Sequence, residues 1–114
     1  MSDPRIDPKL RRELDGLVTS LCKAMNDAKR LVILYALRDR PHTVGELGEV
    51  LDAPQSNTSQ HLAVLRDQDL VEAERQGNNV VYSLRHPKII TAIDLLREVM
   101  QDEFARQQAL RSED

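Results

Sequence analysis

The side chains best suited to chemistry in this sequence gather between positions 55 and 66. They carry amide, hydroxyl, imidazole and guanidinium groups, which can hydrogen-bond the base edges and phosphates of double-stranded DNA. The candidate DNA-contacting residues of this segment are Gln55, Ser56, Asn57, Ser59, Gln60, His61 and Arg66. Taken alone, these residues also fit an ordinary solvated helix face, so the elements around them decide the interpretation.

Those elements indicate a helix-turn-helix over about residues 43–68. Thr43 and Glu46 have the spacing of a capping box, which begins a short helix. Pro54 follows a short turn and is tolerated only in the first positions of the next helix. The inward-facing residues predicted for that second helix are Thr58, Leu62 and Leu65. Their spacing leaves the polar residues of the same segment on the outer side, where a recognition helix needs them.

After Asp69 the residue pattern changes to period two, which predicts a β-hairpin over about residues 70–85. Its centre is Gln76-Gly77-Asn78-Asn79, where Gly and Asn supply the positive φ that a tight turn needs. A hairpin directly after a helix-turn-helix is the wing of a winged helix-turn-helix. The candidate wing contacts to the minor groove or DNA backbone are Arg75, Asn78 and Asn79.

Two longer helices are predicted at about residues 8–25 and 87–110, each with an apolar stripe. The stripes comprise Leu10, Leu14, Leu17, Leu21 and Ala24 in the first helix, and Ile89, Ile93, Leu96, Met100 and Phe104 in the last. So small a core cannot cover both stripes, so we expect them to pack across the two-fold axis of a homodimer. Two recognition helices would then lie about one turn of DNA apart, ~34 Å.

Between these parts, the apolar run from Leu31 to Leu37 predicts a buried central helix, because the preceding Asn26-Asp27 can cap it. The predicted order is therefore helix, helix, short helix, turn, helix, hairpin and long helix. This is a mainly α fold with a small β-hairpin, a winged helix-turn-helix that forms a dimer through its first and last helices.

Composition and length fit one globular domain over residues 1–114. The chain is 40% hydrophobic and 31% charged, and it has no Trp, so the core must be aliphatic. No apolar run approaches the ~20 residues of a membrane span and the polar N-terminus lacks a signal core, which predicts a cytoplasmic protein. The net charge of −3 is unusual for a DNA-binding protein and requires a locally neutral or basic contact surface.

Three stretches of the chain resemble the ArsR family of bacterial and archaeal winged-helix repressors. They are Asp27–Leu34, Gln55–Arg66 and Val81–Leu84, and the resemblance spans roughly residues 21–84. Its most specific parts are the pattern S-x-x-S-x-H-L-x-x-L, which begins at Ser56, and the tyrosine of the second wing strand. The resemblance implies a homodimer that binds an imperfect palindrome near a promoter and is released by an inducer. By position it also implies that Ser56, Asn57, Ser59, Gln60 and His61 face the groove and that residues 75–79 form the wing.

The sensing sites of that family do not carry over to this chain. Its thiolate metal sites place cysteines at the start of the first short helix, where this chain has His42–Leu47. Its metal site on the last helix uses Asp and His, whereas Asp94, Glu98 and Asp102 have no histidine among them. Sulfur- and redox-responsive members carry a cysteine where this chain has Tyr35. We therefore expect no metal site and no cofactor, and the inducer is not identified.

Cys22 is the single cysteine, which excludes an internal disulfide and fits a reducing compartment. It is interpreted as a small apolar filler of the first helix, or as a thiol near the dimer interface that senses oxidants or electrophiles.

Two functions compete, and neither is enzymatic, because no nucleophile–base pair, phosphate-cradling loop or metal triad is recognisable. The leading prediction is a sequence-specific DNA-binding transcriptional repressor. The alternative is a winged-helix protein–protein interaction module without DNA binding. It is favoured by the carboxylates near the predicted DNA face, which are Asp67, Asp69, Glu72 and Glu74.

Overall fold

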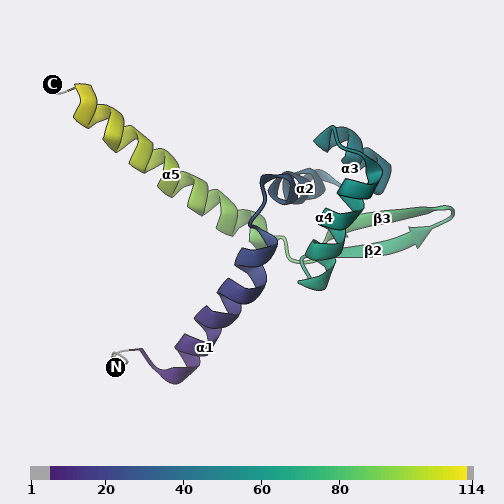
Figure 1. Cartoon of the computed structure of the whole chain (residues 1–114), viewed down its shortest axis with the longest axis horizontal. Helices are drawn as coiled ribbons and strands as arrows, with labels where there is room; N and C mark the ends of the chain where they lie inside the picture. The colour runs from purple at the N-terminus through teal and green to yellow at the C-terminus, as the bar shows by residue number, and fades with distance from the viewer. Residues whose placement is uncertain (1–5, 113–114) are drawn as a thin grey trace.

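The computed structural model describes residues 6–112. Its elements are, in chain order, α1 (Pro8–Gly16), the π-helical segment η1 (Leu17–Cys22), α2 (Ala28–Asp39), β1 (His42–Thr43), α3 (Val44–Leu51), α4 (Gln55–Asp67), β2 (Val71–Gln76), β3 (Asn79–Leu84) and α5 (Lys88–Ser112). Together they form the expected winged helix-turn-helix (Figure 1). None of the helices within residues 6–112 is both long and apolar enough to cross a membrane.

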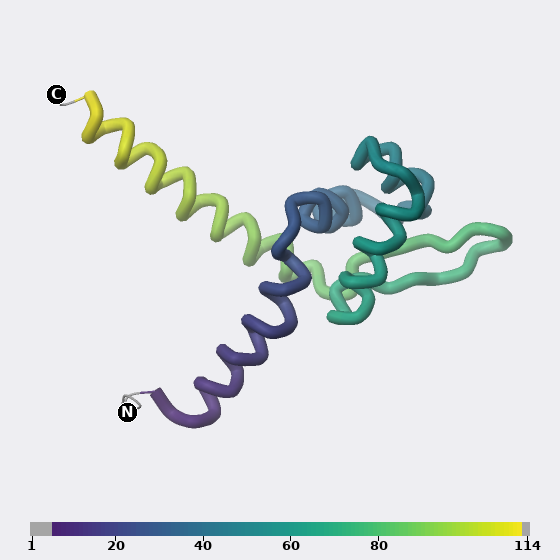
Figure 2. Tube along the Cα trace, in the orientation of Figure 1, coloured from purple at the N-terminus to yellow at the C-terminus, as the bar shows by residue number. Residues whose placement is uncertain are grey.

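Two long helical arms leave the body of the fold in different directions. We call residues 8–22 and 95–112 the arms; the trace in Figure 2 shows that they diverge and that the β2–β3 hairpin projects away from both. The body between them consists of α2, α3, α4, the sheet and the first turns of α5. The predicted DNA-contacting elements and the predicted dimer helices are thereby separated in space.

The core is aliphatic, as the composition predicts. Its fully buried side chains come from α2, α3, α4 and the turn before β2, and include Ile33, Leu34, Leu47, Leu62, Leu65 and Leu70. From α5 the buried side chains are Ile89, Ile90 and Ile93. Burying a residue of this size contributes about 1.5–3 kcal/mol, so these few contacts hold the three helices of the body in one arrangement.

The helix-turn-helix begins at the predicted capping box. The Thr43 hydroxyl accepts a hydrogen bond from the Glu46 amide (3.2 Å), and the Glu46 carboxylate accepts one from the Thr43 amide (2.9 Å). At the other end of α3, Asp52 adopts a left-handed conformation (φ 50°) and reverses the chain. Gly48 allows the turn to close, because a Cβ there would lie 3.3 Å from the Ala53 carbonyl oxygen and 3.5 Å from the Thr58 hydroxyl.

The sheet has one more strand than the sequence predicts. Its order is β1-β3-β2, with both pairs antiparallel, and His42 pairs with Tyr82. His42 is buried, and its Nδ1 bonds the Arg40 carbonyl oxygen at 2.7 Å. A strand of two residues is too short to show a period-two pattern, which explains the missed prediction. In the hairpin turn only Gly77 takes a positive φ (62°), so the asparagines do not share that role.

The first helix also differs in one respect from the uniform α-helix expected over about residues 8–25. It begins as predicted, with the Asp7 carboxylate accepting a hydrogen bond from the Leu10 amide (2.7 Å). From Leu17 to Cys22 the turns widen to a π-helix. Such segments occur mostly inside α-helices as single widened turns, and residue spacing alone does not reveal them.

The capping box gives a pH-dependent contribution to stability. The Thr43 amide, followed by the Arg40 guanidinium at 3.0 Å, lowers the pKa of Glu46 to about 2 from its ordinary value of 4.5. A lowered pKa stabilises the fold above the unfolded-state pKa, and this stabilisation disappears as the pH falls from about 4.5 to about 2. We therefore expect Glu46→Gln to be less stable than wild type near neutral pH, with the gap closing across this acid range. Urea unfolding at several pH values measures the gap. Glu49→Gln, on the exposed side of the same helix, is the control, and a gap independent of pH would contradict the prediction.

Candidate nucleic-acid interface

The inner face of helix α4 is buried in the core, and its polar residues lie on the outer face. Thr58, Leu62 and Leu65 are completely buried, as predicted. The exposed candidate residues are Gln55, Ser56, Ser59, Gln60 and Arg66. Ser56 and Gln60 are one helical turn apart, so their side chains project from the same face. This face offers hydroxyl and amide groups with little bulk, which is what close approach to base edges requires.

His61 lies at the edge of this face rather than fully on it. Its side chain is half buried, and its Nδ1 lies 3.3 Å from Nη1 of Arg30 on α2. Since a guanidinium has donors only, Nδ1 must accept this bond, and the neutral ring carries its proton on Nε2. Arg30 therefore fixes the tautomer of His61 and leaves Nε2–H as the ring's free donor.

Arg30 also joins α4 to the end of the first helical arm. Its Nε donates to the Ala24 carbonyl oxygen (2.6 Å) and its Nη2 to that of Lys23 (3.3 Å). These carbonyls lie in the last turn of the first helix, where the Lys23 oxygen also accepts a bond from the Asn26 amide at 3.3 Å. Sequence reasoning missed this role, because Arg30 and His61 are 31 positions apart and share no motif.

Asn57 is also half buried, unlike its exposed neighbours. Its Oδ1 is buried and has no hydrogen-bond partner among residues 6–112. A buried acceptor without a donor costs roughly 1–3 kcal/mol, which a donor brought by a binding partner would recover. Asn57 therefore sits at the base of the recognition face rather than at its tip.

Arg75 lies on the opposite face of the wing from Glu72 and Glu74. Arg75, Asn78 and Asn79 are all exposed at or near its tip. Along β2, side chains alternate between faces, so Arg75 projects from the face opposite Glu72 and Glu74. The repulsion that these carboxylates would exert on phosphate is thereby directed away from the Arg75 face.

Arg66 lies apart from the other candidates of α4. It is two turns beyond Ser59 and lines the same depression as Asp69, Glu72 and Glu74. Glu72 also forms an ion pair with Arg85 at 3.5 Å. Contact between Arg66 and DNA stays a prediction, made less favourable by these neighbouring carboxylates.

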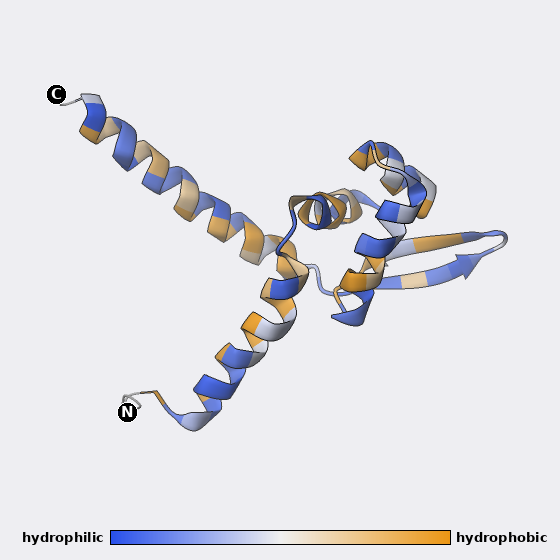
Figure 3. Cartoon of the chain, in the orientation of Figure 1, coloured by the Kyte–Doolittle hydropathy of each residue, from blue (hydrophilic) through white to orange (hydrophobic). Residues whose placement is uncertain are grey.

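The arms expose the stripes that the sequence predicts. In the first arm Leu10, Leu14 and Leu17 are 40–46% exposed, and in the last arm Met100 is 71% and Phe104 61% exposed. Figure 3 shows apolar residues recurring along both arms. Ile89 and Ile93, at the start of the last stripe, are instead buried in the core. An exposed apolar stripe of this kind, continuous with the buried core, is typical of a surface that another chain or a ligand covers.

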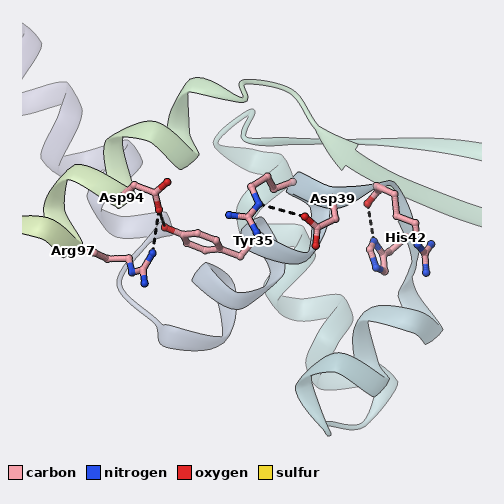
Figure 4. A network of polar contacts seen from close by, with 7 residues as sticks. Tyr35, Asp39, His42, Asp94 and Arg97 are labelled. Carbon is pink, nitrogen blue, oxygen red and sulfur yellow. Dashed lines mark hydrogen bonds and ion pairs between the residues drawn. The ribbon is translucent and has the colours of Figure 1, made fainter.

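A polar cluster that the sequence does not predict joins α2 to α5 (Figure 4). Oδ1 of Asp94 accepts hydrogen bonds from the Tyr35 hydroxyl and from Nη1 of Arg97, the latter at 3.2 Å. Burial, and then the Asp94 hydrogen bond, raise the pKa of Tyr35, while the Tyr35 and Arg97 bonds lower the pKa of Asp94. Asp94 is half buried within this cluster, whereas Glu98 and Asp102 are exposed.

Cys22 ends the π-helical segment and is exposed. It lines a depression with Val18, Thr19, Lys23 and Asn26. An exposed thiol does not fill the core of its own chain, so that interpretation is not supported. Its role as a redox sensor stays a prediction.

Comparison with known proteins identifies the family. Residues 27–73 match the family described as "Bacterial regulatory protein, arsR family". The HTH-type transcriptional regulator YgaV of Escherichia coli K12 is 38% identical over 81 residues, which cover 70% of this chain and 82% of YgaV. The chain belongs to the ArsR family.

Solved structures of similar proteins agree with this ArsR-family fold. Reduced HlyU from Vibrio cholerae is 36% identical with a TM-score of 0.68, and the match covers 78% of this chain and 94% of HlyU. The homodimeric winged helix-turn-helix DNA-binding domain Mb0332 from Mycobacterium bovis is 22% identical with a TM-score of 0.71, covering 90% and 91%. The predicted family and fold are confirmed. This ArsR-family chain is a DNA-binding transcriptional regulator and not an enzyme, and the alternative of a pure protein-interaction module finds no support.

The Arg30 contacts predict a measurable effect on His61. In wild type, long-range ¹⁵N–¹H NMR should find the neutral His61 ring with its proton on Nε2. Arg30→Gln should release the ring into a mixture of tautomers and lower the free energy of unfolding by about 1–3 kcal/mol, because carbonyls and imidazole lose a charged donor. Lys29→Gln, an exposed neighbour on α2, is the control. An unchanged tautomer in Arg30→Gln would contradict the assigned hydrogen bond.

Proposed function

We propose that two copies of this regulator bind an inverted-repeat operator, each placing α4 in the major groove and its wing on the adjacent backbone or minor groove. The observation that carries the proposal is the division of α4 into a fully buried inner face and an exposed face of hydroxyl and amide groups. That division fixes which side chains DNA can meet.

The residues of the recognition face take different roles in this proposal. Ser56, Ser59 and Gln60 contact base edges, because they are exposed and short or flexible enough to reach them. Gln55, in the first turn of α4, lies where helix amides and the helix dipole attract a phosphate. Asn57 and the Nε2–H of His61 complete the contact from the edge of the face.

The homodimer is supported by the exposed stripes of the arms. A monomer leaves Met100 and Phe104 largely in solvent, and burying apolar surface contributes about 25 cal/mol per Å². Pairing two arms across a two-fold axis also gives the operator its inverted-repeat symmetry. The Mb0332 domain, which shares the fold, is homodimeric.

Binding near a promoter would block transcription, so we propose a repressor that an inducer releases. A relative, HlyU of Vibrio cholerae, is named a transcriptional activator, so a reporter fused to the operator should decide the direction for this chain. Because the chromosome lies in the cytoplasm, we place the regulator there.

The recognition face predicts the result of a DNA-binding experiment. We expect the purified regulator to bind a fragment upstream of its own gene selectively over competitor DNA, and to bind more weakly as salt rises. Ser56→Ala with Gln60→Ala should weaken specific binding at least about tenfold, since each base contact contributes about 1–3 kcal/mol. Fluorescence anisotropy at two salt concentrations measures both effects.

The matched control for this experiment is Thr91→Ala, an exposed residue of α5 outside the helix-turn-helix and wing. Specific binding that survives the double substitution, or that Thr91→Ala reduces equally, would contradict the assigned face. If the upstream fragment fails, selection from a genomic library identifies other sites before the proposal is abandoned.

The arms predict the assembly state. Wild type should sediment as a dimer, and Phe104→Glu should dissociate it, because a carboxylate cannot be buried in an apolar interface without a partner. DNA affinity should fall together with dimerisation. Phe104→Leu keeps the apolar contact and should remain a dimer. A dimer that tolerates Phe104→Glu would place the interface elsewhere.

A further inference from the structure

A shallow depression between α2 and α5 lies at the base of the last arm, which contributes Arg97 to it. Its volume is about 480 Å³, and it is lined by Leu31, Val32, Tyr35, Arg38, Ile93 and Arg97. This volume falls within the range of small-molecule sites, about 300–1,000 Å³. Neither the recognition face of α4 nor the wing contributes to it, so DNA would leave it open.

The lining combines apolar side chains with two cations. Leu31, Val32 and Ile93 supply aliphatic surface, and Val32 is 43% exposed to solvent. The guanidinium carbons of Arg38 and Arg97 lie 5.4 and 5.6 Å from the centroid of the Tyr35 ring. An aromatic ring holds such cations in place by cation–π attraction.

No carboxylate is among the residues that line the depression. Arg97 bonds Asp94 through Nη1, and Arg38 contacts Asp39 through Nε at 3.4 Å. Each guanidinium has further N–H groups, and paired N–H donors match the two oxygens of a carboxylate. The depression is therefore complementary to a molecule with an apolar body and one negative charge.

We propose that this depression binds a small organic anion, an aromatic or otherwise apolar body that carries a single carboxylate. Its body packs on Leu31, Val32 and Ile93, and its carboxylate bonds Arg38 and Arg97. We further infer that binding changes DNA affinity, a part of the proposal that rests on the proposed function.

The coupling follows from what holds α2 and α5 together at this point. Asp94 on α5 accepts hydrogen bonds from both Tyr35 on α2 and Arg97 (Figure 4). A ligand carboxylate that engages Arg97 competes with Asp94 for the same guanidinium. α5 continues from this site into the arm, whereas α2 packs on α3 and α4 in the body. The ligand therefore acts where the DNA-binding body meets the dimer arm.

The test uses the full-length protein and three carboxylates, benzoate, phenylacetate and 1-naphthoate, each beside its matched alcohol. Titrations are followed by methyl and amide NMR up to about 5 mM, because even a millimolar site is detected there. We expect at least one carboxylate to give saturable shifts centred on Leu31, Val32 and Ile93. The matched alcohol should bind at least about tenfold more weakly than the carboxylate. Arg38→Gln should lower the affinity for the carboxylate by a similar factor. Arg106→Gln, in the distal part of α5, should leave its affinity unchanged.

The proposed ligand site is contradicted if no carboxylate gives saturable shifts, or if the alcohols bind equally well. It is also contradicted if Arg38→Gln leaves the affinity unchanged, or if the shifts map to the exposed stripes of the arms. The coupling is tested separately by DNA affinity at saturating carboxylate. We expect a change of at least about fivefold in wild type and none in Arg38→Gln. An unchanged affinity overturns the coupling alone. If the protein binds a carboxylate but selects no DNA site, the proposed ligand site stands and the proposed function fails.

Discussion

The structure depends on the complete burial of one side of α4. Thr58, Leu62 and Leu65 have no exposed surface, and Leu47 and Gly48 of α3 are likewise buried, with a Cβ at Gly48 only 3.5 Å from the Thr58 hydroxyl. Turning α4 by one residue, about 100°, would bring His61 or Arg66 into an aliphatic core. An unpaired polar group there costs several kcal/mol. Core packing thus determines which side chains of α4 are exposed, and the proposed DNA contacts are drawn from these.

Polar contacts then connect this fixed helix to the rest of the chain. Arg30 reaches from α2 to His61 on one side and to the last carbonyls of the first helix on the other. The Tyr35–Asp94 hydrogen bond joins α2 to α5 in a similar way. Both arms are therefore connected to the body through α2, which itself contributes the buried Ile33 and Leu34. α2 is thus the element that contacts both arms and α4.

Features governed by periodicity or local capping could be predicted from the sequence, and features that depend on distant residues could not. The capping box, the inner face of α4, the hairpin and the exposed stripes follow from residue spacing, and the structure agrees with each. The strand His42–Thr43 and the π-helical turns leave no periodic signal. The spacing predicts Asn57 and His61 on the same outer face as Ser56, but both are half buried. His61 contacts Arg30 of α2, whose position no helical pattern specifies. The link between Tyr35 and Asp94 spans 59 positions and becomes visible only in three dimensions.

The order of the sheet has a consequence for how this protein avoids aggregation. With β3 in the centre, β2 is a full-length edge whose unpaired amides and carbonyls could template another chain's strand. Its sequence opposes that, because Glu72, Glu74 and Arg75 place charges at three of its six positions. β1, the other edge, is only two residues long. Strand pairing between molecules is thus disfavoured at both edges of the sheet. The exposed apolar surface that could drive association lies on the helical arms.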